Sequence, residues 1–456
     1  MYLALNIAGI VIFLAIGLLF SHDRKKIDWK SIGILTALNL ALAWILTGFP
    51  WGRAAIQAAA AAFNELVDVA WRGINFALAN WVGAEGVDPQ PVNFVTSALL
   101  PILLILPIFD ILTYIGFLPW VIKWVGRGLS LVTRQPKFET FYSIEMMFLG
   151  NTEAPVVSKL QLQRMSQARN VVIAMMTMSC VTASILASYI RMMPAEYILT
   201  AVPLNCLNAL IVTSMLYPVD VPAEEDVIHT YGDGLAENAG ERLVPVAAAC
   251  EESATARTAE TAPAAAAAAK PGLGAWLGRT FKHDQNRTRK EPFFSFLGDS
   301  ILNGGRLVLI VTANVIAFVA LAALIDKVLG VIWSPLSLES VLGVFMYAPS
   351  LLLGLDPSSA WDMSQIMGLK LVTNEFVAMG RVMDTVTAFP PHYRAVLTVF
   401  LTSFANFGTL GMVIGTFKGI VDKERNDLIA KNVGRMFLSG ILVSLLSAGM
   451  AGLVVW

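Results

Sequence analysis

The sequence predicts an all-α polytopic membrane protein with eight transmembrane helices, two opposed re-entrant hairpins, interfacial helices and an inverted structural repeat. The first observation is composition: hydrophobic residues make up 56% of 456 residues and charged residues 14%, whereas a soluble domain carries about 25% charged residues. The second is that apolar stretches of membrane-spanning length recur along the chain. The third is that two further apolar stretches carry an amide and a carboxylate mid-run, around Glu153 and Glu375.

Eight stretches are long enough to cross a bilayer, which takes about 20 apolar residues. They are residues 2–20, 31–48, 94–116, 170–190, 196–217, 305–325, 394–417 and 435–455. The connection 21–30 is rich in lysine and arginine, so the positive-inside rule places it in the cytoplasm. With eight crossings, both termini are then predicted on the external side. The first stretch lacks a basic leader and a small-residue cleavage site, which favours a retained helix over a signal peptide.

The segments between these spans have distinct characters. Segments 58–83 and 117–134 are amphipathic, which predicts interfacial helices on the outer and inner side. Segments 136–166 and 358–390 are apolar with polar residues mid-run, which predicts hairpins that enter and leave by the same face. Residues 218–292 are polar and alanine-rich, which predicts a disordered cytoplasmic loop of unassigned role.

These segments divide the chain into four parts. Residues 1–93 are expected to form N-terminal scaffold helices with the external interfacial helix. Residues 94–217 form the first inverted repeat, with its hairpin tip at 150–155. Residues 218–292 form the cytoplasmic loop, and residues 293–456 form the second inverted repeat, with its tip at 373–376.

The first tip reads Gly150-Asn151-Thr152-Glu153-Ala154-Pro155. A carboxylate at membrane depth costs about 2.5–3.5 kcal/mol on insertion scales, so it normally faces a partner, a cavity or a ligand. The glycine and the proline interrupt helical geometry and leave backbone groups free. Such backbone is tolerated at membrane depth only where it is buried in protein or lines a wet cavity. The tip is therefore predicted to lie at a substrate site.

The second tip repeats this chemistry with Asn374 and Glu375. Each tip is followed by a span that small polar residues interrupt, at 178–184 and at 403–409. The spacing agrees, because 184 − 153 = 31 and 406 − 375 = 31. The predicted topology inverts one half relative to the other. Inverted repeats whose hairpins and broken helices meet at the midplane are typical of secondary transporters.

Other function classes find little support. A net charge of −1 argues against a broad nucleic-acid surface. Three scattered cysteines indicate neither a disulfide framework nor a zinc site. The four histidines lie outside the apolar spans, which argues against haem ligation. No phosphate-binding G-x-x-x-x-G-K-[ST] motif is present. We therefore expect no enzyme activity, no cofactor and no ATP-driven mechanism.

Three motifs resemble those of the concentrative nucleoside transporter family: Gly150–Pro155, Lys370–Ala378 and Phe404–Gly411. The resemblance runs from about residue 90 to the end, without residues 218–292. Within the family, the sequence is most similar to the proton-coupled bacterial branch. The resemblance implies a homotrimer in the bacterial inner membrane in which each protomer moves its own nucleoside by an elevator-like motion. It also implies that uptake is driven by protons or sodium ions.

The resemblance further implies roles for individual residues. Those expected to hold the base are Asn151, Thr152, Glu153 and Ile185. Those expected to hold the ribose are Glu375, Asn406 and Thr409, with Phe404 nearby. The chemistry agrees, because a carboxylate accepts hydrogen bonds from vicinal hydroxyls and an amide can both donate to and accept from a base edge. In the alternative reading, Glu153 and Glu375 are structural and pair with a lysine such as Lys370.

The prediction of the coupling ion rests on two positions where this sequence departs from the family pattern. Sodium-coupled members place an asparagine four residues before the tip glycine and a serine in the broken fourth span. Here these positions hold Met146 and Cys180, poor ligands for a hard cation that prefers oxygen. We therefore expect no metal site and a proton as the coupling ion. Its candidate carriers are Glu153, Glu375 and Glu145, since burial favours a neutral carboxyl group.

Three alternatives stay open at this stage. The first is sodium coupling, through backbone carbonyl groups that remain near the substituted positions. The second is transport of a different polar solute on the same scaffold. The third, from another class, is a membrane sensor or gate that binds nucleosides without moving them.

Overall fold

The computed structural model describes residues 1–77, 99–151, 153–222, 224–226, 228, 292–332 and 337–456. Within these ranges the regular secondary structure is entirely helical, which confirms the all-α class. The first part contains α1 (Tyr2–Leu19), α2 (Trp29–Ala43), α3 (Pro50–Ala77), α5 (Ile102–Tyr114), α6 (Phe117–Thr133), α7 (Lys137–Glu145), α8 (Glu153–Val157), α9 (Lys159–Arg164), α10 (Gln167–Thr177), α11 (Ala183–Met192) and α12 (Ala195–Leu216). The second part contains α15 (Phe293–Ile332), α16 (Leu338–Leu352), α17 (Pro357–Val372), α18 (Glu375–Val382), α19 (Pro391–Leu401), α20 (Phe407–Lys418), α21 (Lys423–Lys431) and α22 (Val433–Gly452).

Five helical segments in the described part of the chain are long and apolar enough to cross a membrane: Tyr2–Leu19, Trp29–Gly48, Ala195–Leu216, Phe293–Ala313 and Val433–Gly452. The helices α5 and α6 form a sixth candidate with a 69° bend between them. The predicted spans 170–190 and 394–417 are each divided into two short helices, α10 with α11 and α19 with α20. The prediction of eight crossings therefore holds only if the bent pair and both divided segments each cross the membrane. It stays a prediction.

Two predicted boundaries differ from the structure. The span predicted from residue 305 begins at Phe293, 305 − 293 = 12 residues earlier. This start is apolar enough to belong to a candidate membrane span, and its Ser300 hydroxyl donates a hydrogen bond to Asp110 of α5. The interfacial helix predicted at 58–83 lies in α3, which begins earlier, at Pro50. Residues 78–83 and 94–98 lie outside the described residues.

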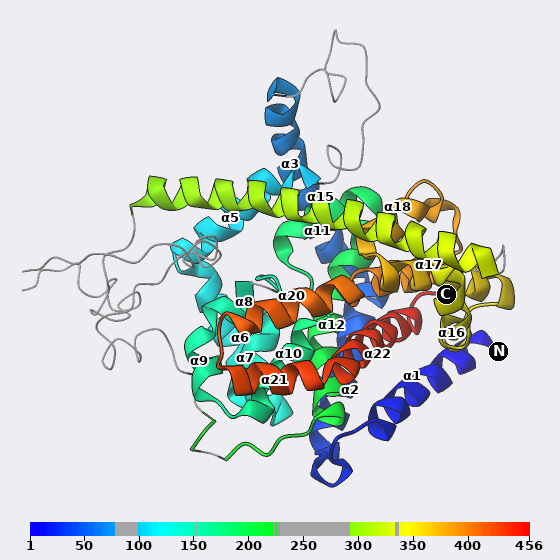
Figure 1. Cartoon of the computed structure of the whole chain (residues 1–456), viewed down its shortest axis with the longest axis horizontal. Coiled ribbons are helices and arrows are strands. Elements are labelled where there is room, and N and C mark those ends of the chain that lie inside the picture. The colour runs from blue at the N-terminus through cyan, green and yellow to red at the C-terminus, as the bar shows by residue number, and fades with distance from the viewer. Residues whose placement is uncertain (78–98, 152, 223, 227, 229–291, 333–336) are drawn as a thin grey trace, which may run out of the picture.

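The centre of the molecule is formed by α12 and α22. In their spanning windows 83% and 67% of residues are buried, against 28% in α1 and 17% at the start of α15. The Asn208 side chain of α12 donates to the Ser447 hydroxyl of α22 at 2.9 Å. Both helices pack against α10 and α19, and Figure 1 shows them in the middle of the molecule. Buried amide and hydroxyl groups of this kind hold helices together where both are apolar.

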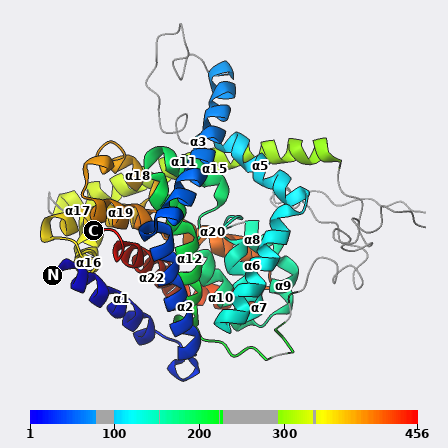
Figure 2. The ribbon, with the colours of Figure 1, turned by 180° about the vertical axis from the view of Figure 1, so that it is seen from behind.

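The long helix α15 runs across one side of this centre, beside α5 (Figures 1 and 2). Its outward face carries exposed large apolar side chains: Ile301, Leu302, Leu309, Ile310, Ile316, Leu321, Leu324, Val328 and Val331. An apolar face of this extent is unusual on a soluble monomer. It suits contact with lipid or with another subunit.

Each predicted hairpin corresponds to helices separated by a short turn. Helices α7, α8 and α9 occupy the first, and the Ser158 hydroxyl donates to Glu145 Oε2 at 2.9 Å across it. Helices α17 and α18 occupy the second and pack against each other. Entry and exit of each hairpin by one membrane face remains a prediction.

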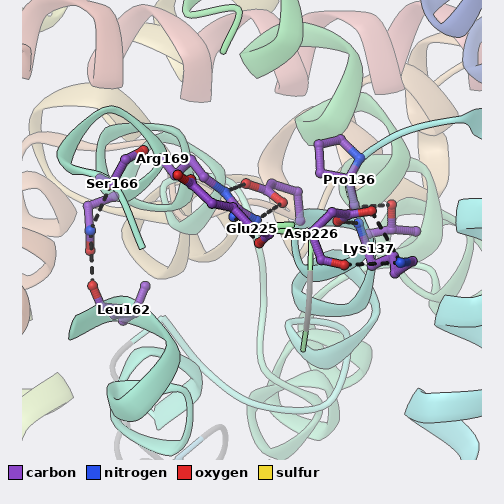
Figure 3. Close-up of polar contacts among 10 residues, drawn as sticks. Pro136, Lys137, Leu162, Ser166, Arg169, Glu225 and Asp226 are labelled. Carbon is purple, nitrogen blue, oxygen red and sulfur yellow. Dashed lines mark hydrogen bonds and ion pairs between the residues drawn. The ribbon is translucent and has the colours of Figure 1, made fainter. Parts of the chain in front are cut away.

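The base of the first hairpin is tied to the chain that follows α12 (Figure 3). Arg169 of α10 forms two hydrogen bonds with the Glu139 carboxylate of α7, at 2.7 and 2.8 Å, and donates a third to the Glu225 carbonyl at 3.0 Å. The Asp226 carboxylate accepts from the Lys137 backbone N–H at the start of α7. The beginning of the predicted 218–292 loop is therefore bound to the hairpin, and residues 229–291 lie outside the described residues.

The two ends of the chain lie at the same end of the molecule (Figure 1). A side chain added at Gly354 would meet the Tyr2 carbonyl at 2.8 Å and the Trp456 ring at 3.1 Å. This closeness agrees with a topology in which both termini share one side. The external location of that side stays a prediction.

Candidate functional site

The second tip places a buried carboxylate between two other elements. Glu375 is the first residue of α18 and is 3% exposed. Its Oε1 accepts a hydrogen bond from the Tyr189 hydroxyl of α11, and its Oε2 accepts one from the Asn406 amide, both at 3.0 Å. The neighbouring Asn374 caps α18 by accepting from the Val377 backbone N–H. The tip, α11 and the break before α20 therefore meet at one carboxylate.

The break between α19 and α20 supplies the amide in this cluster. Asn406 caps α20, and its Oδ1 accepts from the Thr409 backbone N–H at 2.9 Å and from the Thr409 hydroxyl at 3.1 Å. The Asn406 Nδ2 donates to the Glu375 carboxylate. Because its oxygen faces two donors and its nitrogen faces an acceptor, the orientation of the Asn406 amide is determined. Phe404, two residues earlier, is 7% exposed. The structure thus brings three predicted ribose-binding residues into one hydrogen-bonded chain.

The first tip carries a carboxylate and a buried amide close together in the chain, Glu153 and Asn151. Glu153 is partly exposed, and its Oε2 accepts from the Gly150 backbone N–H at 3.0 Å. Asn151 is 7% exposed, and its buried Nδ2 has no hydrogen-bond partner among the residues that the structure describes. Thr152 lies outside the described residues. Buried amide groups are normally paired, so among the described residues the Asn151 Nδ2 is one of several buried polar atoms that could still gain a partner.

Helix α11 links the two tips. Just before it, the Thr182 hydroxyl donates to the Phe148 carbonyl of the first tip at 3.4 Å. Seven residues later, since 189 − 182 = 7, Tyr189 reaches Glu375 of the second tip. Seven residues make two helical turns and about 10 Å of rise, which is comparable to the length of a base joined to a ribose. Ile185, 3% exposed, lies between these two levels.

Tyr189 is the site residue that sequence reasoning missed. Besides its hydrogen bond to Glu375, its ring packs edge-on against Phe376, with centroids 5.0 Å apart. A signal was present, because Tyr189 lies four residues after Ile185 and therefore on the same helical face. Its partner on a distant hairpin left no signal in the local sequence.

The two positions that bear on sodium binding are both buried. Met146 is fully buried, and the Cys180 thiol lies 3.8 Å from both the Met176 carbonyl oxygen and the Cys206 sulfur. Sulfur is a soft ligand and is a poor match for a hard cation. In the described part of the chain, no group of three His, Cys, Asp or Glu side chains is arranged to hold a metal ion.

Comparison with known proteins identifies the family. Residues 197–452 match the family model described as "Na+ dependent nucleoside transporter C-terminus", and residues 8–81 match the one described as "Na+ dependent nucleoside transporter N-terminus". The purine nucleoside transport protein NupG of Bacillus subtilis is 39% identical over 100% of both chains. The chain belongs to the concentrative nucleoside transporter family. It is therefore a multi-pass membrane protein that transports nucleosides and not an enzyme.

More distant relatives agree with this assignment. The nucleoside permease NupC of Helicobacter pylori is 24% identical over 99% of this chain and 97% of its own. The structure of CNTnw in an inward-facing substrate-bound state matches with a TM-score of 0.79 at 22% identity, and covers 100% of this chain and 98% of the other. At this identity the structural match establishes the fold of this family member.

Proposed function

We propose that this protein imports nucleosides by proton symport. The observation that carries the substrate assignment is the buried Glu375 carboxylate, which Tyr189 and Asn406 hold in place at the second tip. A carboxylate offers about four acceptor positions, and these two donors use only part of them. The remaining positions suit the vicinal hydroxyls of a ribose, with Asn406 and Thr409 beside them and Phe404 packing nearby.

The base is assigned to the first tip. The Asn151 Nδ2, which has no hydrogen-bond partner among the described residues, is a donor for a base edge, and Glu153 with Thr152 would add further polar groups. Ile185 of α11 supplies an apolar surface between the two tips. The 39% identical relative is a purine nucleoside transport protein, and we extend that preference to this chain.

Proton coupling is supported by the sulfur-containing side chains at Met146 and Cys180. The candidate proton carriers are Glu153, Glu375 and Glu145, of which Glu145 is 2% exposed and bonded only to a neutral hydroxyl, that of Ser158, among the described residues. Sodium coupling is the second candidate, because both matching family models are described as Na+ dependent.

The wider mechanism follows the same proposal. The protein works as a homotrimer in the bacterial inner membrane, and each protomer carries its nucleoside by an elevator-like movement. The exposed apolar face of α15 supports this arrangement because it suits a subunit or lipid contact. The inverted repeat and the two re-entrant hairpins are part of the same proposal.

Uptake of radiolabelled adenosine into proteoliposomes tests the coupling ion. A pH gradient, acidic outside, is expected to drive accumulation without sodium, and a sodium gradient at equal pH is expected not to. Accumulation that requires sodium at fixed pH would establish the second candidate instead. Uptake without any gradient would indicate a facilitator, and binding without uptake would indicate a sensor or gate.

Deoxynucleosides test the ribose assignment. A hydrogen bond to a charged group is worth about 1.5–3 kcal/mol, so 3′-deoxyadenosine is expected to compete roughly ten- to hundredfold more weakly than adenosine. The matched control is 5′-deoxyadenosine, which keeps both vicinal hydroxyls and is expected to compete nearly as well as adenosine. Competition assays with labelled adenosine measure both. Equal competition by the 3′-deoxy compound would contradict the role of Glu375.

Tyr189→Phe tests the link between α11 and the second tip. The variant keeps the ring against Phe376 but removes one hydrogen bond to a carboxylate, so the Kd for adenosine is expected to rise about tenfold. Tyr393→Phe is the control, because it removes a buried hydroxyl that has no hydrogen-bond partner in the described residues. Calorimetric titration of both variants compares them, and similar affinities would place Tyr189 outside the site.

A further inference from the structure

Lys370 is a fully buried lysine in the last turn of α17, next to the second tip. Lysine is almost never fully buried unless it is paired. Its Nζ donates to the Phe400 carbonyl and to the Ser403 hydroxyl, each at 2.6 Å, and lies 4.3 Å from the centroid of the Phe400 ring. The carbonyl oxygen, the hydroxyl oxygen and the face of the aromatic ring each carry partial negative charge on the side that faces the ammonium group.

The surroundings of this ammonium group have the character of a cation site. Phe400 lies in the last turn of α19, where the helix leaves carbonyl groups without intrahelical partners and its dipole is negative. A hydroxyl oxygen and an aromatic face complete the set, and both attract cations.

The hydrogen bonds continue from this site into the centre of the molecule. The Ser403 hydroxyl pairs with the Ser444 hydroxyl of α22 at 2.6 Å, and Ser444 donates to the Gly440 carbonyl at 2.8 Å. A side chain added at Gly440 would meet the Ala405 Cβ at 2.9 Å, so α22 closely approaches the break. One ammonium group thus connects α17, the break after α19, and α22.

We propose that Lys370 is a built-in cation that positions the second tip against the α19–α20 break. Glu375 lies five residues beyond Lys370, and Asn406 lies three residues beyond Ser403. The ammonium group therefore sets the separation of the two groups that meet at the candidate ribose site. This inference rests on the proposed function of that site, and Lys370 acts as a positioning residue that does not touch the nucleoside.

Chemical rescue of the full-length, purified protein tests this role. Lys370→Ala removes the side chain from Cγ to Nζ. The n-propylammonium ion has the same three carbons and the same ammonium group, so it can fill the space that the substitution leaves. Adenosine binding by the variant is expected to weaken roughly tenfold, as for a lost charge-assisted bond, and to recover when propylammonium is added. The unfolding temperature is expected to fall and recover in parallel. Neutral 1-propanol, of similar shape, is expected to restore neither.

Two further variants serve as controls. Lys370→Met fills the space without a charge, so it is expected to bind adenosine as weakly as the alanine variant and not to respond to propylammonium. Lys418→Ala removes an exposed lysine at the end of α20 and is expected to change neither binding nor stability. A Lys370→Ala chain that folds only in propylammonium would also support the proposal.

Several results would overturn it. The Lys370→Met variant could bind adenosine as tightly as the unchanged protein, or propanol could rescue Lys370→Ala as well as propylammonium does. The Lys370→Ala variant could also fail to fold in propylammonium, or it could regain stability there without regaining adenosine binding. Failure of the proposed function looks different, because the wild-type chain itself would then bind no nucleoside. In that case the propylammonium-dependent shift in unfolding temperature still tests the cation site.

Discussion

Glu375→Gln is expected to abolish nucleoside uptake and to weaken adenosine binding by at least about a hundredfold. The reason is that the substitution removes the charge that strengthens bonds to two ribose hydroxyls, each worth about 1.5–3 kcal/mol. It also turns one acceptor into a donor facing Tyr189 or Asn406, which both donate to the carboxylate now. Titration calorimetry and uptake into proteoliposomes measure the two effects.

The matched control is Glu196→Gln, which neutralises a half-buried acid in the first turn of α12. It is expected to leave affinity and uptake close to those of the unchanged protein. The unfolding temperature separates a binding role from a structural one. A Glu375→Gln protein that binds adenosine normally, or one that loses binding only because it unfolds, would remove Glu375 from the proposed site.

Arg169→Met is expected to lower the free energy of unfolding by about 3–5 kcal/mol, since it leaves a buried charge without its partner. That charge is the carboxylate of Glu139, which is 4% exposed and receives two short hydrogen bonds from Arg169. The substitution also releases the Glu225 carbonyl. Denaturant titration of the protein in detergent measures the loss in the free energy of unfolding.

The double variant Arg169→Met with Glu139→Leu separates charge from packing. Apolar replacement of a whole buried ion pair is often neutral or stabilising, so the double variant is expected to be more stable than Arg169→Met alone. Lys26→Met breaks the exposed pair with Asp220 and is expected to cost about 1 kcal/mol or less. Equal losses in the single and double variants would show that side-chain packing, not charge, explains the effect.

The breaks in two of the predicted spans illustrate what local sequence can predict. Small polar residues and a capping asparagine interrupt an apolar run at 402–406, and the structure ends α19 and starts α20 there. At 178–182, between α10 and α11, the break contains small polar residues such as Ser179 and Thr182 but no asparagine. Helix breaks depend on the residues at the break itself, so they are visible without any knowledge of the fold.

The start of α15 shows the opposite case. Its first turns contain Asp299 and Ser300, and the predicted span begins only after them, at residue 305. The Ser300 hydroxyl has its hydrogen-bond partner in Asp110, 190 residues away in the chain, which local sequence does not indicate. Similarly, the sequence alone allows Lys370 to pair with a glutamate, whereas its hydrogen bonds go to the Phe400 carbonyl and the Ser403 hydroxyl.

Composition, apolar spans of membrane-crossing length and three short motifs thus predicted the membrane class and the family, which the structure and the relatives confirm. These properties depend on residue type and local spacing, which a linear chain records directly. The hydrogen-bond partners became known only from the packing of distant helices. They are Tyr189 for Glu375, Glu139 for Arg169, and the Phe400 carbonyl and Ser403 hydroxyl for Lys370. A buried polar group is stable only when a specific donor or acceptor faces it, and which one does so depends on how the helices pack together.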